Sequence, residues 1–136
     1  MPDSLYIIDT HALIWYLDKD HRLSPSAKRI LDDPDARLLI PAIALSEALF
    51  IVERKPHLYG FSEVDLLDDV KKDSRMRVVA LNLKAIIATL DCKAIPEMHD
   101  RQIVATALLA QRAGFDVAIL TRDGAIKDAN LVPTLW

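Results

Sequence analysis

The sequence predicts an α/β fold in which a mostly parallel sheet lies between two layers of helices. Short apolar runs with strand character alternate with helical patterns along all 136 residues. Strands separated by helices of ten or more residues form right-handed βαβ units, which makes neighbouring strands parallel. A hydrophobic content of 51% with only 3 glycines indicates a helix-rich globular protein. We therefore expect a single three-layer α/β/α domain over residues 1–136.

The expected elements follow in order along the chain. Strands are expected at residues 5–9, 38–40, 77–81 and 117–120, with one short extended piece within residues 130–136. Helices are expected at residues 11–17, 26–31, 42–54, 62–72, 83–90 and 100–113. Ser24 before Pro25, Ser62 and Asn82 are the residue types that begin helices, and Gly114 is the type that ends one. In the helix at 62–72, we expect Val64, Leu67 and Val70 to face the core.

Four acidic residues occupy positions where an unpaired charge is costly. Asp9 ends the first strand, Asp123 follows the strand at 117–120, Asp100 opens a helix and Glu47 interrupts an apolar helix face. Buried carboxylates cost several kcal/mol each unless something neutralises them, and no lysine or arginine shares these positions. Mg²⁺ or Mn²⁺ would neutralise them, because hard cations prefer oxygen ligands. The sequence therefore predicts a metal-dependent phosphodiester enzyme, with its site beyond the carboxyl ends of the strands.

Each acid also has an ordinary structural explanation. Asp9 and Asp123 could simply cap helices, and Asp100 could interact with a helix dipole. Glu47 is harder to explain, because it is expected to share an inner helix face with Ile43, Phe50 and Ile51. A buried ion pair, for example with Arg54, is the alternative for Glu47. Four separate structural explanations are less plausible together than one metal cluster.

Composition narrows the function further. A formal net charge of −3 and a pI of 5.7 give no overall basic surface for nucleic acid. Cys92 is the only cysteine, which excludes an intramolecular disulfide and a thiolate zinc site. No apolar run approaches the roughly 18 residues of a membrane span, and the N-terminus lacks a signal-peptide pattern. We expect a cytoplasmic protein with no membrane association.

Several segments resemble a known family when taken in order. They are residues 7–15 (IIDTHALIW), Ser46-Glu47, residues 99–107 (HDRQIVATA), residues 120–123 (LTRD) and residues 132–136 (VPTLW). The chain resembles the PIN-domain nucleases over its whole length, and among them the VapC-type ribonuclease toxins of prokaryotic toxin–antitoxin pairs. This resemblance implies endonucleolytic cleavage of RNA by metal-activated water, which leaves 5′-phosphate and 3′-hydroxyl ends.

The resemblance also implies roles for individual residues. Asp9, Glu47, Asp100 and Asp123 would surround one or two Mg²⁺ or Mn²⁺ ions, with Asp9 central and Glu47 binding through water or orienting the attacking water. Thr121 matches the family's hydroxyl position beside the last acid. The secondary candidates are Thr10, His11, Thr121, Arg101 and Arg122. His11 and His99 could contact the substrate or could be ordinary helix residues.

The expected partners are an RNA substrate, a protein antitoxin and a second copy of the chain. An antitoxin could insert an arginine or lysine into the acidic site as a substitute for the cation. Apolar residues expected to meet a partner are Trp15, Tyr16, Leu49, Phe50 and Val52. The basic residues Lys71, Lys72, Arg75 and Arg77 could bind RNA or form a solvated helix end.

Three other functions fit less well. A haloacid-dehalogenase-type phosphatase needs a second aspartate at position 11, where this chain has histidine. A phosphoacceptor receiver domain needs a lysine at the end of a late strand, which is missing here. A PIN-like scaffold without catalysis would not need all four acids. A PIN nuclease of RNA processing, without a toxin role, remains an alternative.

Overall fold

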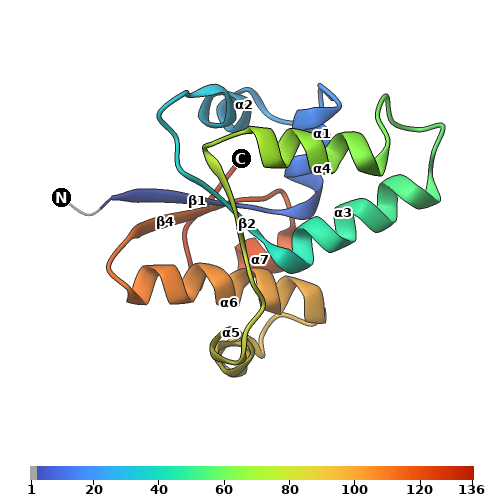
Figure 1. Cartoon of the computed structure of the whole chain (residues 1–136). Helices are drawn as coiled ribbons and strands as arrows, with labels where there is room; N and C mark the ends of the chain where they lie inside the picture. Colours follow the sequence, from blue (N-terminus) through green and yellow to red (C-terminus); the bar gives the residue numbers. More distant parts are fainter. Residues whose placement is uncertain (1–2) are drawn as a thin grey trace.

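Five strands form one sheet at the centre of the computed structural model, which describes residues 3–136 (Figure 1). The strands are β1 (Ser4–Ile8), β2 (Leu38–Pro41), β3 (Met76–Val79), β4 (Asp116–Leu120) and β5 (Thr134–Leu135). Their order across the sheet is β3-β2-β1-β4-β5, and every neighbouring pair is parallel. The predicted sheet is therefore confirmed, and all of its carboxyl ends lie at the same edge.

Helices cover both faces of this sheet, which confirms the three-layer α/β/α architecture. They are α1 (Thr10–Leu17), α2 (Pro25–Asp32), α3 (Ala42–Arg54), α4 (Glu63–Lys72), α5 (Leu83–Ala88), the 3-10 turn η1 (Thr89–Cys92), α6 (Met98–Arg112) and α7 (Gly124–Ala129). In Figure 1, α1, α2 and α4 lie above the sheet, and α5, α6 and α7 lie below it. No helix within residues 3–136 is both long enough and apolar enough to cross a membrane.

Alternating side chains on the central strands supply two separate hydrophobic cores. In β1, Ile7 packs into the core between the sheet and α6, whereas Ile8 packs into the core between the sheet and helices α1 and α2. In β4, Ile119 and Leu120 divide in the same way. All four side chains are fully buried, because both faces of a parallel sheet are covered by helices.

The residues predicted to cap helices do so in the structure. The Ser24 hydroxyl accepts a hydrogen bond from the Ala27 N–H at 3.1 Å, with Pro25 at the first helical position. Ser62 forms a reciprocal capping box with Asp65. Gly114, at the end of α6, adopts a φ of 101°, a conformation that glycine accommodates without strain. These local signals set helix boundaries close to the predicted ones.

Three details of the sequence prediction were wrong. In α4 the core face is formed by Leu66 and Val70, and Val64 is 63% exposed. Helix α6 begins at Met98, two residues earlier than expected, because Glu97 caps it. Helix α7 was not predicted, since its six residues are too few for a periodic apolar pattern.

Candidate metal centre and nuclease site

All four candidate acids line one cavity of about 380 Å³ at the carboxyl edge of the sheet. The lining residues are Asp9, His11, Ala12, Trp15, Glu47, Glu97, Asp100, Arg122, Asp123 and Trp136. Strands β1 and β4 are hydrogen-bonded neighbours, and Ile8 pairs with Leu120 in their register. The chain leaves both strands at the same level, which brings Asp9 and Asp123 to one place.

Asp9 is the most deeply placed of the four acids, with an exposure of 7%. Its carboxylate accepts a hydrogen bond from the Thr10 N–H at 2.7 Å and another from the Thr121 hydroxyl at 2.6 Å. Burial raises the pKa of Asp9, although the bonds from Thr121 and Thr10 act in the opposite direction. The expected capping role is therefore present, but it accounts for only part of the carboxylate's environment.

Thr121 connects the two strand-end acids. Its hydroxyl donates to Asp9 and accepts a hydrogen bond from the Asp123 N–H at 3.0 Å. Thr121 is fully buried, so these bonds are shielded from water. The Asp123 carboxylate is held in turn at the start of α7, where it accepts from the Ile126 N–H at 2.9 Å. The hydroxyl beside the last acid thus positions both Asp9 and Asp123.

Asp100 projects into the cavity from the first turn of α6. Within residues 3–136, its carboxylate has neither a hydrogen bond nor an ion pair, although its backbone N–H donates to Glu97 at 3.0 Å. Loss of solvation raises the pKa of Asp100 to about 7, with further contributions from the charges of Asp123, Asp9, Glu97 and Glu47. A carboxyl group perturbed in this way gains from a nearby cation.

Glu47 reaches the cavity from α3 and is held by a histidine on α6. The His99 Nδ1 atom lies 3.3 Å from a Glu47 carboxylate oxygen and 3.2 Å from a Glu97 oxygen. The predicted alternative, an ion pair with Arg54, does not form; the Arg54 guanidinium lies over the Phe50 ring instead, 5.4 Å from its centroid. His99 therefore links the two helices that carry Glu47 and Asp100.

The predicted inner face of α3 around Glu47 was wrong in part. The buried face of α3 is Ala44, Ala48 and Val52, whereas Phe50 is 56% exposed. Glu47 is half-buried beside this face, with 30% of its side chain exposed. Glu47 lies between the buried face of α3 and the cavity, so its carboxylate lines the cavity and is not enclosed in the core.

The secondary candidates differ in their placement. His11 and Arg122 line the cavity, and both lie against Trp15: the His11 ring centroid is 5.4 Å away, and the Arg122 guanidinium 5.5 Å. Arg101 is directed away from the site and donates to the backbone carbonyls of Lys93 and Ile95. Thr10 is fully buried and contributes only its backbone N–H to Asp9.

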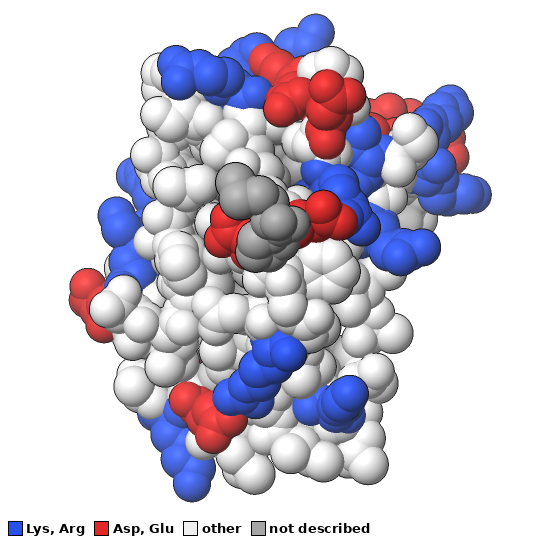
Figure 2. Space-filling view, turned by 90° about the vertical axis from the view of Figure 1, so that its left-hand side faces the viewer, with Lys and Arg blue, Asp and Glu red and all other residues white. Residues whose placement is uncertain are grey.

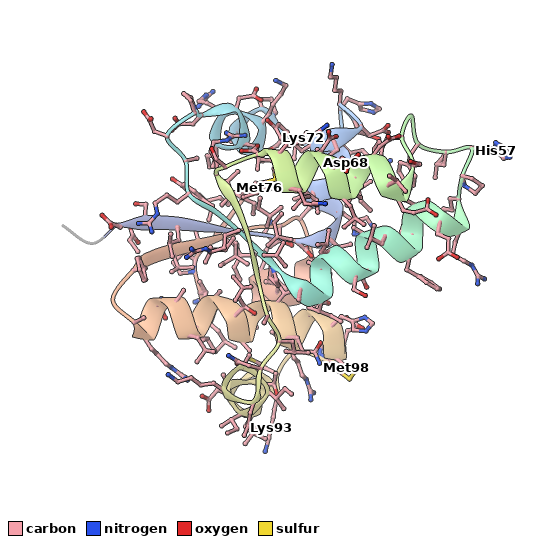
Figure 3. The ribbon with its side chains drawn as sticks, viewed as in Figure 1. His57, Asp68, Lys72, Met76, Lys93 and Met98 are labelled. Atoms are coloured by element: carbon pink, nitrogen blue, oxygen red, sulfur yellow. The ribbon has the colours of Figure 1, made fainter. Side chains whose placement is uncertain are left out.

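The basic run, which extends from the last turn of α4 into β3, lies near the opposite edge of the sheet. Lys72 and Met76 mark where α4 ends and β3 begins, which is the amino end of that strand (Figure 3). Arg75 is committed to structure, because it pairs with Asp73 at 2.8 Å and donates to the carbonyl of Leu31. Figure 2, which looks onto the molecule from the left of Figure 1, shows basic and acidic side chains interspersed on that face. Arg75 is therefore a partly buried structural residue and not part of a solvated helix end, and RNA binding by the rest of the run stays a prediction.

The apolar residues expected to meet a partner are mostly internal. Trp15 is 8% exposed and Val52 1%, so both belong to the core, while Tyr16 and Leu49 are half-buried. Phe50 is the member of that set with a large exposed surface. A larger exposed apolar surface was missed; it lies on α5 and η1 and consists of Leu83, Ile86, Ile87 and Leu90.

Four of the cavity residues were not assigned to the site from the sequence: Ala12, Trp15, Glu97 and Trp136. Glu97 lines the cavity as the N-cap of α6, where its side chain accepts from the Asp100 N–H. Glutamate is an uncommon N-cap, so no local signal marked it. Trp136 reaches the cavity from beyond β5 and packs edge-on against Trp15, with ring centroids 5.7 Å apart. That contact joins residues far apart in sequence and could not be predicted.

The donor set of this cavity fits a hard divalent cation. Carboxylates from four different elements converge there, and the guanidinium that lines the cavity, Arg122, lies over an aromatic ring. No three His, Cys, Asp or Glu side chains of residues 3–136 are gathered tightly enough to form a ready-made ligand set. Mg²⁺ suits such an arrangement, because it usually keeps several waters and binds proteins through one or two carboxylates.

Comparison with known proteins identifies the family. The PIN domain family model matches residues 6–130. No curated protein matches by sequence. Among solved structures, the chain is similar to VapC20 of Mycobacterium tuberculosis, a toxin that cleaves the sarcin–ricin loop, with 14% identity, 93% of this chain and 96% of that chain covered and a TM-score of 0.68.

Two complexes give comparable similarities. VapBC2 of Rickettsia felis, bound to a promoter DNA fragment, shows 15% identity over 96% of this chain and 97% of that chain, with a TM-score of 0.67. A toxin–antitoxin complex from Klebsiella pneumoniae shows 19% identity over 96% of both chains, with a TM-score of 0.65. At these identities the structures establish a shared fold, and the match to the family model over most of the chain establishes that this protein belongs to the PIN domain family.

Proposed function

We propose that this protein is a Mg²⁺- or Mn²⁺-dependent endoribonuclease that acts as the toxin of a toxin–antitoxin pair. The observation that carries the proposal is the single cavity in which Asp9, Glu47, Asp100 and Asp123 converge from separate elements. The raised pKa values of Asp9 and Asp100 support it, because ionised carboxylates in that environment need positive charge. PIN-domain relatives of the VapC type are nucleases, and the similar solved structures include VapC20, described as a toxin that cleaves the sarcin–ricin loop.

In this proposal Asp9, Asp100 and Asp123 hold the cation, and Glu47 contributes through water or orients the attacking water. Thr121 fixes the Asp9 carboxylate and the Asp123 backbone, and the Ile126 N–H fixes the Asp123 carboxylate, so that both acids need little rearrangement. His99 of α6 lies beside Glu47, with its Nδ1 atom 3.3 Å from a carboxylate oxygen. When bound, the ion supplies positive charge for the phosphoryl oxygens and activates water for attack. No covalent intermediate is required.

A protein inhibitor is part of the proposal. Several similar structures are toxin–antitoxin complexes, including those from Rickettsia felis and Klebsiella pneumoniae. An acidic cavity would accept an arginine or lysine of an inhibitor as a substitute for the cation. The exposed apolar surface on α5 and η1 supports self-association into a homodimer, because surfaces of this kind usually meet a partner.

The direct test incubates the purified chain with RNA in Mg²⁺, Mn²⁺ or EDTA and maps the ends of the products. We expect cleavage that leaves 5′-phosphates, and none in EDTA. Expression of the wild-type chain should slow bacterial growth, whereas expression of Asp100→Asn should not. Co-expression of the proposed antitoxin, a small protein encoded beside this chain, should restore growth.

The outcomes distinguish the alternatives. Metal-dependent cleavage without any effect on growth would favour a PIN nuclease of RNA processing. RNA binding without cleavage by wild-type protein would favour a non-catalytic PIN-like scaffold.

A further inference from the structure

An aromatic wall stands beside the four carboxylates in the same cavity. It consists of His11, Trp15 and Trp136, all of which line the cavity. The His11 ring is tilted by 45° against Trp15, and the Trp136 ring meets Trp15 in an edge-on arrangement with an interplanar angle of 65°. The edge-on contact is a preferred geometry of aromatic pairs, and it fixes the Trp136 ring relative to Trp15.

Part of the Trp136 side chain remains exposed to solvent although the ring packs against Trp15. Trp15 is 8% exposed and serves as the buried support of the wall, whereas Trp136 is half-buried and His11 is exposed. A large aromatic side chain that lines a cavity and keeps part of its surface in solvent can accept a planar ligand. Trp15 and Trp136 are also the only tryptophans of the chain. Both are therefore placed at this one cavity.

Positive charge lies next to this wall. The Arg122 guanidinium lines the cavity over Trp15, and Arg22 approaches the same ring at 4.9 Å from its centroid. Arg22 is paired with Asp20 at 2.7 Å, while Arg122 has no ion pair within the part of the chain that the structure describes. Arg122 is exposed and can meet a phosphate without breaking an existing ion pair.

We propose that the aromatic wall is a nucleobase subsite, in which an unpaired base next to the scissile phosphate stacks on Trp136 while Arg122 contacts the adjoining phosphate. This inference rests on the proposed ribonuclease function and specifies its substrate as RNA that is single-stranded at the cut. Aromatic side chains and arginine planes are the surfaces on which proteins stack unpaired bases. Stacking alone discriminates weakly between bases, so the subsite selects for strand state more than for sequence.

The experiment measures RNA binding through tryptophan emission, which reports on this cavity alone because both tryptophans line it. The protein is the full chain carrying Asp100→Asn, in Mg²⁺, with the integrity of the RNA checked on a gel. The probes are a short single-stranded RNA, the same RNA with one abasic position scanned along it, and its duplex. We expect the single strand to quench the emission, and the duplex not to.

One abasic position should raise the Kd about tenfold, as expected for the loss of one stacked base. Trp136→Leu should raise the Kd by a similar factor and make the abasic position neutral. Trp136→Phe, which keeps an aromatic face, should stay close to the parent protein. Val64→Ala, which removes an exposed apolar side chain on α4 outside the cavity, is the control and should leave the Kd unchanged.

Equal affinity for abasic and intact RNA, or RNA binding without quenching, would overturn the subsite. Absence of RNA binding would overturn it as well. If the proposed inhibitor protein changed the tryptophan emission and RNA did not, the aromatic wall would be a contact surface for that inhibitor instead. The nuclease proposal is judged separately. Base-dependent quenching without cleavage by the wild type would support the nucleobase subsite and contradict the nuclease proposal. Cleavage without quenching would support the nuclease proposal and contradict the subsite.

Discussion

Aspartate side chains at the carboxyl and amino ends of the strands have opposite electrostatic environments. At the carboxyl edge, Asp9 is buried without an ion pair to any of residues 3–136, and burial raises its pKa. Toward the amino edge, Asp73 is paired with Arg75 at 2.8 Å, and that guanidinium lowers the pKa of Asp73. One aspartate has a folded environment that disfavours its charge, and the other has an environment that stabilises it.

The difference separates a site from a structural support. Asp73 and Arg75 satisfy one another and also tie the segment before β3 to the carbonyls of Leu31 and Asp33. Asp9 and Asp100 have no such ion pair within residues 3–136, and the proposed cation would offset their charge. Removing a charge should therefore lower activity at one edge and stability at the other.

The largest expected effect is at Asp9. Asp9→Asn should reduce RNA cleavage by at least about 100-fold, since even residues that only support metal ligands contribute 10–100-fold. The free energy of unfolding in EDTA should stay the same or rise, because a carboxylate with a raised pKa opposes folding when it is ionised. Cleavage rates and thermal melts measure both quantities.

The matched control for this change is Asp116→Asn, at the exposed start of β4 on the opposite edge. It should leave cleavage unchanged. Retention of cleavage by well-folded Asp9→Asn protein would contradict the metal-nuclease proposal.

The second prediction concerns the amino edge. Arg75→Ala should lower the free energy of unfolding by about 2 kcal/mol, roughly 30-fold in the folding constant, because it breaks charged hydrogen bonds in a largely buried position. Cleavage per folded molecule should not change. Urea denaturation gives the free energy, and Arg77→Ala, at an exposed position in β3, is the control with little expected effect. Unchanged stability of Arg75→Ala would show that the pairing at this edge does not support the fold.

A smaller effect is expected at Glu47. Glu47→Gln should lower cleavage about tenfold with little change in metal-free stability, because its partner His99 is itself partly exposed. Glu53→Gln, on the same helix but at an exposed position, is the matched control. A melting temperature in EDTA that falls by many degrees would instead make Glu47 a structural partner of His99.

The smallest effect is a pH dependence of the metal-free protein. The pKa of Asp100 is raised to about 7 in the folded state, whereas the unfolded state titrates near its ordinary value of about 4. Between these values the folded state holds the proton more tightly, so the contribution of Asp100 to stability falls as pH rises from about 4 to 7 and is constant above.

The melting temperature of Asp100→Asn in EDTA should therefore rise relative to that of the wild type between about pH 4 and pH 7, and the difference should stay constant above pH 7. The difference between the two proteins is the measurement, because carboxyl groups distant from the cavity titrate equally in both. A constant difference from pH 4 to pH 8 would contradict the raised pKa.

Much of this protein could be predicted from its sequence, because the relevant signals are local. The alternation of apolar runs and helical patterns predicted the parallel three-layer fold, and Ser24, Ser62 and Asn82 cap helices as expected. The chemistry of four costly acids indicated a metal site. Their convergence in one cavity is consistent with that prediction, and the roles of the individual acids remain a proposal.

The tertiary structure decided which side chains contact one another and which line the same cavity. Only the fold could show that Arg101 binds the carbonyls of Lys93 and Ile95, away from the cavity. Only the fold brings Trp136 against Trp15, and only the fold places the exposed apolar surface on α5 and η1. The physical reason is distance along the chain: propensities and capping depend on neighbouring residues, whereas cavities and ring contacts depend on how distant elements pack.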